Sequence, residues 1–77
     1  MKAITVKVST IDGVKRFVSK AQFVDGKVLV STLDNMYRVD GKSIMGMFSL
    51  DLTKPIVITF EEENNEEFET YLKSVAI

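Results

Sequence analysis

The chain has 77 residues, a formal net charge of −1, and neither cysteine nor histidine. This length supplies one small hydrophobic core, so we expect a single domain over residues 1–77. Without cysteine there are no disulfides or thiolate metal sites, and we expect a cytoplasmic protein with no metal or other cofactor. No apolar run reaches the roughly 20 residues of a membrane span, and the N-terminal residues alternate in polarity, unlike a signal peptide.

Charge is distributed unevenly along the chain. Residues 1–42 contain eight Lys or Arg and four Asp, whereas residues 43–77 contain two Lys and seven Asp or Glu. The basic excess is spread over several elements, so we expect no nucleic-acid binding. The acidic run Glu61–Glu67 lacks the ligand spacing and glycine turn of a calcium loop, and we interpret it as a solvated strand end and helix start.

The first two elements differ in periodicity. Residues 3–9, AITVKVS, place Ile4, Val6 and Val8 on one side, which predicts a half-buried strand. Residues 13–23 then carry apolar residues at helical spacing, which predicts an amphipathic helix with Asp12 as its N-cap. The apolar positions of this helix are Val14, Phe17, Val18 and Ala21.

The middle of the chain predicts a hairpin and a short helix. Two strand-like segments, KVLVSTL at 27–33 and MYRV at 36–39, flank the Asp34-Asn35 pair, which tolerates turn geometry. Residues 43–50 predict a helix with Ser43 as N-cap, weakened by Gly46.

A strand and a helix complete the chain. Residues 55–60, PIVITF, begin with a proline, which the first position of a strand tolerates, and predict a fourth strand. The last helix has Asn64 or Asn65 as its cap and acidic residues in its first turn. Its apolar stripe comprises Phe68, Tyr71, Leu72 and Val75.

The resulting order, βαββαβα, predicts an α+β fold. Apolar helix stripes require a sheet face to cover, and half-polar strands require that the other face meet water or a partner. We therefore expect a four-stranded antiparallel sheet with three helices on one face.

The segment VDGKSIMGMFSL, residues 39–50, resembles the region around the regulatory serine of the HPr family, the phosphocarriers of the sugar phosphotransferase system. The family pattern there is approximately K-S-I-M-G-x-M-S-L, and residues 42–46, Ser49 and Leu50 agree with it. The segment TVKVS and Gly13 also match the family's first strand and the glycine that follows it. The resemblance implies the family's open-faced β-sandwich, whose element order is the one predicted above.

The phosphocarrier motif of that family, G-[IL]-H-x-R-P, is not present. The corresponding stretch is GVKRFV, with Lys15 where the resemblance places the histidine. A lysine cannot replace a neutral imidazole that accepts and relays phosphate, so we expect no phosphate transfer on histidine and no catalytic residue. Because the interval from Gly13 to Val18 is shorter than in the family, we also expect the proline and the first helical turn to be missing.

The resemblance directs attention to the segment that begins at Ser43. It implies that Ser43 is phosphorylated and that a partner-binding surface forms around it, and adaptable thioethers and an aromatic ring suit such a surface. A phosphate would add about −1.5 to −2 charge at a helix start, which favours anions. The predicted partner-binding residues are Ile44, Met45, Met47, Phe48 and Arg16. The alternative is that Ser43 is only a helix cap, that the apolar residues are divided between core and surface, and that Arg16 is a solubilising group.

Two functions of different classes remain open. The first is a non-catalytic HPr-like regulatory or adaptor protein, similar to the family's catabolite-repression homologue, with an HPr kinase/phosphorylase and a transcriptional regulator as partners. The second is a structural interaction module that kept the scaffold without phosphorylation and associates with itself, for example as a homodimer.

Overall fold

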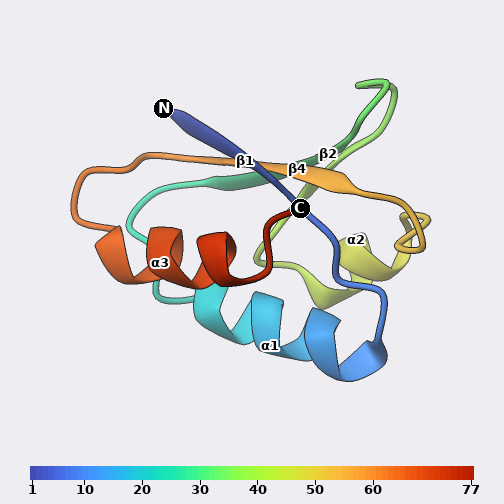
Figure 1. The fold of residues 1–77 in the computed structure, drawn as a ribbon, viewed down its shortest axis with the longest axis horizontal. Coiled ribbons are helices and arrows are strands. Elements are labelled where there is room, and N and C mark those ends of the chain that lie inside the picture. The colour runs from blue at the N-terminus through green and yellow to red at the C-terminus, as the bar shows by residue number, and fades with distance from the viewer.

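The seven expected elements all form, in the expected order, in a computed structural model that describes residues 1–77. In chain order these elements are β1 (Lys2–Val6), α1 (Ile11–Ala21), β2 (Val28–Thr32), β3 (Arg38–Asp40), α2 (Ile44–Phe48), β4 (Ile56–Phe60) and α3 (Glu66–Ser74). The strands form one antiparallel sheet in the order β1-β4-β2-β3. All three helices lie on the same side of this sheet, which confirms the predicted α+β architecture (Figure 1).

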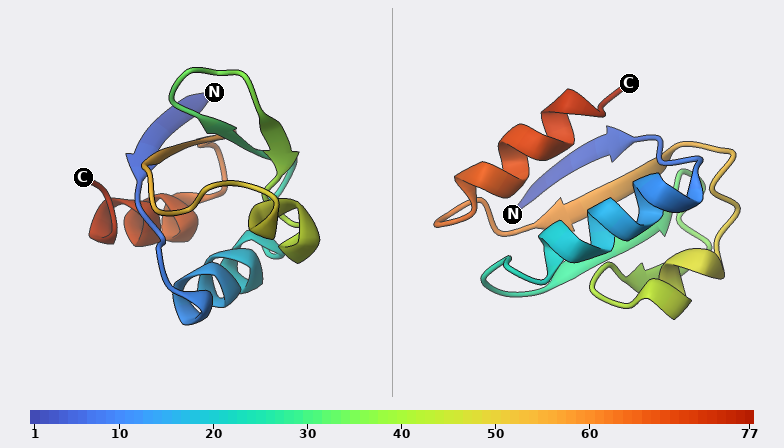
Figure 2. Two further views of the ribbon diagram at one scale, coloured as in Figure 1. Left: turned by 90° about the vertical axis from the view of Figure 1, so that its right-hand side faces the viewer. Right: turned by 90° about the horizontal axis from the view of Figure 1, so that it is seen from below.

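The centre of the sheet explains why its helix-facing side is buried. Ile58 of β4 lies opposite Ile4 of β1 on one side and Val30 of β2 on the other. Because strand side chains alternate, this register directs the apolar row toward the helices. Two layers result, with α1 and α3 beneath the strands and α2 beneath the end of the sheet that carries β3 (Figure 2).

Three aromatic rings join the layers. Phe68 of α3 lies with its ring centroid 5.9 Å from that of Phe17 in α1 and 5.2 Å from that of Phe60 in β4, the second pair being edge-to-face. Such tilted arrangements are the favoured geometry of aromatic pairs. The cluster connects both long helices to the central strand, so it fixes the position of α1 against α3.

The start of α1 differs from the prediction in two respects. Thr10, and not Asp12, is the N-cap: its backbone is extended and its Oγ1 accepts a hydrogen bond of 2.9 Å from the N–H of Gly13. Asp12 lies inside the first turn, where its charge still suits the helix dipole. Since the helix begins at Ile11, Gly13 lies within the helix and not in the segment before it.

The cap of α3 also has a different role from the one expected. Asn65 occupies the N-cap position, but its side chain makes no capping bond. It is buried, and its Oδ1 accepts from the N–H of Asp25 at 2.9 Å while its Nδ2 donates to the carbonyl oxygens of Asp25 and Glu61. Asn65 therefore ties the loop after α1 to the end of β4.

The hairpin between β2 and β3 turns at Asn35, whose φ of 61° is in the left-handed region that asparagine tolerates. This agrees with the predicted turn at Asp34-Asn35. The tip of the hairpin curves away from the helix layer (Figure 1). None of the helices has both the length and the apolar character needed to cross a membrane.

Candidate functional site

The loop before α2 is held against the sheet by a close approach at Gly41. Its N–H donates a 2.7 Å bond to the carbonyl of Val28, and a Cβ added at this buried glycine would lie 2.6 Å from Cγ1 of Val28. A side chain at this position would require the buried Val28 side chain to move. The chain then turns, with the N–H of Ser43 bonded to the carbonyl of Asp40 at 3.0 Å.

Ser43 begins α2 as predicted. Its backbone is extended and its Oγ accepts a 3.1 Å hydrogen bond from the N–H of Gly46. The same residue's carbonyl accepts from the N–H of Met47, which closes the first turn. Capping of this kind satisfies one of the free N–H groups at a helix start. Ser43 is half-buried, and its hydroxyl oxygen is already hydrogen-bonded to the N–H of Gly46. It lies next to the exposed residue Ile44.

The apolar residues of α2 divide between the surface and the core. Met45 is 79% exposed, Phe48 46% and Ile44 37%, whereas Met47 is 0% exposed. The prediction that Met47 binds a partner is wrong, because it is one of the largest fully buried side chains and belongs to the core cluster. Ile44, Met45 and Phe48 remain as an exposed apolar group on one short helix, which we call the α2 patch.

The loop that precedes the patch is anchored to the end of α1. Nζ of Lys42 donates a 2.9 Å bond to the carbonyl of Val24, and Nε2 of Gln22 donates a 2.6 Å bond to the carbonyl of Lys42. These two bonds join residues that are 18 and 20 positions apart in the sequence. They hold Ser43 and the patch at a defined place beside α1.

Arg16 does not join this surface. It is exposed in the middle of α1, and neither a hydrogen bond nor an ion pair connects it to α2. Its charge acts instead on Tyr71 of α3: burial raises the pKa of that phenol, and the Arg16 charge partly opposes the rise. No hydrogen bond or ion pair joins Arg16 to Ser43, and the neighbouring Lys15 is likewise an exposed helix residue.

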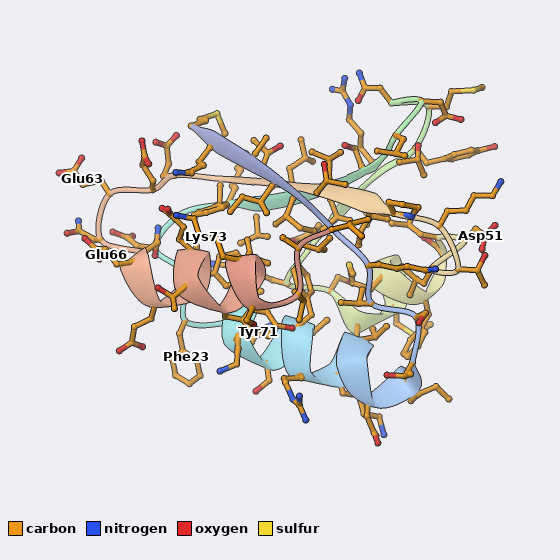
Figure 3. The ribbon with its side chains drawn as sticks, in the orientation of Figure 1. Phe23, Asp51, Glu63, Glu66, Tyr71 and Lys73 are labelled. Carbon is orange, nitrogen blue, oxygen red and sulfur yellow. The ribbon has the colours of Figure 1, made fainter.

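The acidic run lies far from the α2 patch. Glu63 and Glu66 project at the end of the molecule where β4 leads into α3, whereas α2 lies at the opposite end (Figure 3). No three Asp or Glu side chains are gathered in an arrangement that holds a metal ion. The exposed Phe23 at the end of α1 projects away from the body of the protein near the same acidic end (Figure 3).

Sequence analysis missed a second exposed apolar group. Leu33, Met36 and Tyr37 lie at the tip of the β2–β3 hairpin and are all exposed. A hollow beside the tip is lined by Leu33 and Tyr37 together with residues of the loop after α2, among them Leu50 and Pro55. The composition of MYRV predicts a strand over residues 36–39, whereas β3 spans Arg38–Asp40, so Met36 and Tyr37 lie in the connection that precedes it.

No protein-family model matches the chain, and no curated protein matches it. Among solved structures, the chain is similar to HPr-C-His from Thermoanaerobacter tengcongensis, with a TM-score of 0.77 and 23% sequence identity over 96% of this chain and 89% of that chain. The fold is HPr-like. In this HPr-like fold the Ser43 segment forms α2, in agreement with the fold that the resemblance implies.

Proposed function

We propose that this HPr-like protein is a non-catalytic regulatory or adaptor protein that binds a protein partner through the α2 patch. The observation that supports this most directly is the exposure of Ile44, Met45 and Phe48 on one five-residue helix. Adjacent exposed apolar side chains on a small protein are typical of an interaction site. Methionine and phenylalanine supply adaptable contacts of the kind that such sites use.

The chain has no group that can carry phosphate as HPr phosphocarriers do. It contains no histidine, and Lys15 stands in the middle of α1 with a lysine side chain in place of an imidazole. An ammonium has no free electron pair with which to accept a phosphoryl group. We infer that phosphoenolpyruvate and the first enzyme of the system leave no acid-labile phosphate on this protein, and finding a phosphoramidate on it would contradict the proposal.

Ser43 is the residue through which the patch is regulated in this proposal. Its hydroxyl lies at the border of the α2 patch, and phosphorylation would add about −1.5 to −2 charge beside three apolar side chains. A charge of that size changes which surfaces bind the patch favourably. A partner with an Arg-lined pocket next to an apolar groove gains affinity, and a wholly apolar partner loses it.

A kinase assay tests the switch. Incubation of the wild type with an HPr kinase/phosphorylase and ATP is expected to add one phosphate by intact mass. Ser43→Asn is expected to add none, and it preserves the fold because asparagine caps helices as well as serine does. Ser49→Ala, which removes the exposed hydroxyl at the other end of α2, is the matched control and is expected to be phosphorylated like the wild type.

Binding to a transcriptional regulator tests the patch itself. Met45→Ala and Phe48→Ala are expected to weaken binding of the phosphorylated protein by about tenfold or more, as apolar contacts at the centre of an interface do. Arg16→Ala is expected to leave binding unchanged, because Arg16 lies outside the patch.

The alternative is a structural interaction module that kept the scaffold without phosphorylation. It is favoured by the capping role of Ser43, since the bond to the N–H of Gly46 by itself accounts for a serine at this position. If the kinase leaves the wild type unmodified, this alternative replaces the first.

A further inference from the structure

Strand β3 forms an open edge of the sheet. It pairs with β2 on one side, through Val30 opposite Val39, and with no strand on the other. The N–H of Thr32 bonds the carbonyl of Tyr37, and the N–H of Gly41 bonds the carbonyl of Val28. By the alternation of antiparallel ladders, the backbone of Val39 faces β2, while the N–H and C=O groups of Arg38 and Asp40 face outward.

The opposite edge of the sheet, strand β1, is partly covered. Val6 of β1 forms a bridge with Ala76, and the N–H of Ile77 donates to the carbonyl of Thr5. The last residues of the chain therefore occupy part of the outer side of β1. No segment pairs with the outer side of β3, where the Asp40 carbonyl accepts from the N–H of Ser43 and the other outward donors and acceptors are open to a second chain.

The side chains of this edge carry opposite charges on one face. Arg38 and Asp40 are two residues apart, so both point to the side of the sheet away from the helices, and both are exposed. Nε of Arg38 donates to Oδ1 of Asn35, and Oδ1 of Asp40 accepts from the N–H of Lys42. Neither charge belongs to an ion pair. The edge thus presents a positive and a negative group, separated by Val39.

We propose that a second copy of this chain pairs with β3 in the antiparallel direction, about a two-fold axis through Val39. In that register Arg38 lies opposite the partner's Asp40, and Asp40 lies opposite the partner's Arg38. The symmetry therefore forms two cross-strand ion pairs from one pair of residues, as an isologous interface requires. The proposal does not depend on Ser43 or on the proposed function.

The backbone supports the same register. Pairing about Val39 joins the outward N–H and C=O groups of Arg38 to those of the partner's Asp40. The carbonyl of Asp40 already accepts from the N–H of Ser43, and a carbonyl oxygen has a second lone pair for the new bond. An unrelated peptide can add to the edge through its backbone, but it does not supply the two reciprocal charges.

Molar mass in solution, measured by analytical ultracentrifugation up to about 1 mM, tests the proposal, because small interfaces belong to the weak class. The wild type is expected to move toward twice its 8.7 kDa as concentration rises. Arg38→Asp and Asp40→Arg each turn both ion pairs into like-charge contacts and are expected to raise the dissociation constant about tenfold or more. Circular dichroism verifies that both variants remain folded, as expected for exposed side chains.

Mixing the two variants is the decisive measurement. In a heterodimer of Arg38→Asp with Asp40→Arg, each position 38 again faces a position 40 of opposite charge, so association is expected to return to the wild-type level. The doubly exchanged chain, Arg38→Asp with Asp40→Arg, is expected to form homodimers for the same reason. A wild type that stays monomeric, or variants that associate as it does, would overturn the proposal. A mixture that fails to recover association would do the same.

A disulfide reports the register independently. The chain has no cysteine, and the two-fold axis places Val39 opposite the partner's Val39 in a pair about 4.5 Å apart between Cα atoms, within disulfide reach. Val39→Cys is expected to form a covalent dimer under mild oxidation, whereas Ala3→Cys on β1 is not. A dimer that crosslinks through position 3 and not through position 39 contradicts pairing at β3.

Discussion

At the scale of single residues, two methionines in one short helix have opposite roles. Met45 and Met47 are two positions apart, which corresponds to about 200° around a helix, so their side chains leave on opposite sides. One is 79% exposed and the other is fully buried. The same chemical group contributes to a surface at one position and to the core at the other.

Truncating the two methionines should therefore give unequal losses of stability. Met47→Ala is expected to lower the free energy of unfolding by about 2–5 kcal/mol, since it removes buried methylenes and leaves a cavity. Met45→Ala is expected to change it by less than about 0.5 kcal/mol. Urea unfolding of both variants beside the wild type measures the difference, and equal losses would place both side chains in the core.

Two glycines near Ser43 should respond to alanine in opposite ways. Gly41→Ala is expected to cost about 1–3 kcal/mol, because its Cβ would lie 2.6 Å from Cγ1 of Val28 and 3.1 Å from Cγ2 of Val30. Gly46→Ala is the matched control: the nearest atoms lie 3.4 Å away or more, and alanine favours a helix by up to about 1 kcal/mol. A lower melting temperature for Gly46→Ala than for Gly41→Ala would contradict the close packing of the loop on β2.

At the scale of elements, the ends of the helices are held by different means. α1 and α2 each begin at a hydroxyl that accepts from the N–H three residues on, at Thr10 and Ser43. α3 has no side-chain cap, and three acidic residues in its first turn face the helix dipole instead. The side chain of Asn65 makes no capping bond and instead links the loop after α1 to the end of β4.

The cap of α1 is tested by substituting Thr10. Thr10→Ala is expected to lower stability by about 1 kcal/mol, whereas Thr10→Ser keeps the hydroxyl and is expected to match the wild type. Asp12→Ala removes only an interaction with the helix dipole and is expected to cost less than Thr10→Ala. Urea denaturation compares the three variants, and a larger effect at Asp12 would return the cap to that residue.

At the scale of the whole molecule, one ion-pair network connects the N-terminal strand to the last helix. Oε2 of Glu69 lies 3.0 Å from Nζ of Lys2 and 2.8 Å from Nζ of Lys73. Hydrogen bonds from Lys73 and Lys2 lower the pKa of the Glu69 carboxyl, and the bond to Glu69 raises the pKa of Lys2. The network thus joins residues from nearly the full length of the chain.

The lowered pKa of Glu69 predicts a loss of stability in acid. A carboxyl whose pKa is lower in the folded state stabilises the fold above its ordinary value of 4.5, and this contribution disappears as pH falls through the lowered value. Glu69→Gln is therefore expected to flatten the fall of melting temperature between about pH 5 and pH 2. Glu63→Gln, which removes an exposed carboxylate that lies outside the helix and has no ion pair, is the control. Equal profiles for the two variants would contradict the role of Glu69.

The sequence by itself determined the features that depend on neighbouring residues. Alternation in residues 3–9 and 55–60 predicted β1 and β4, and helical spacing predicted the buried side of α1, because these periodicities report which face of an element is covered. The cap at Ser43 was predictable for the same reason, since capping involves only residues within one turn. For α1 the sequence predicts Asp12 as the N-cap, whereas the N-cap is Thr10, two residues earlier. Threonine and aspartate both suit that position, and only the backbone conformation distinguishes them.

Only the tertiary structure decided which side chains of α2 are available to a partner. A helix of five residues is too short to show a period, so the position of α2 against the sheet determined that Met47 is buried and Met45 exposed. The place of β3 at the edge was equally beyond the sequence, because strand order arises from pairings between segments far apart in the chain. In the same arrangement the last residues meet β1 only at Thr5 and Val6, and no strand pairs with the outer side of Arg38 and Asp40. Packing of the core decides which strands are neighbours, but it does not decide what lies beside the outermost strand.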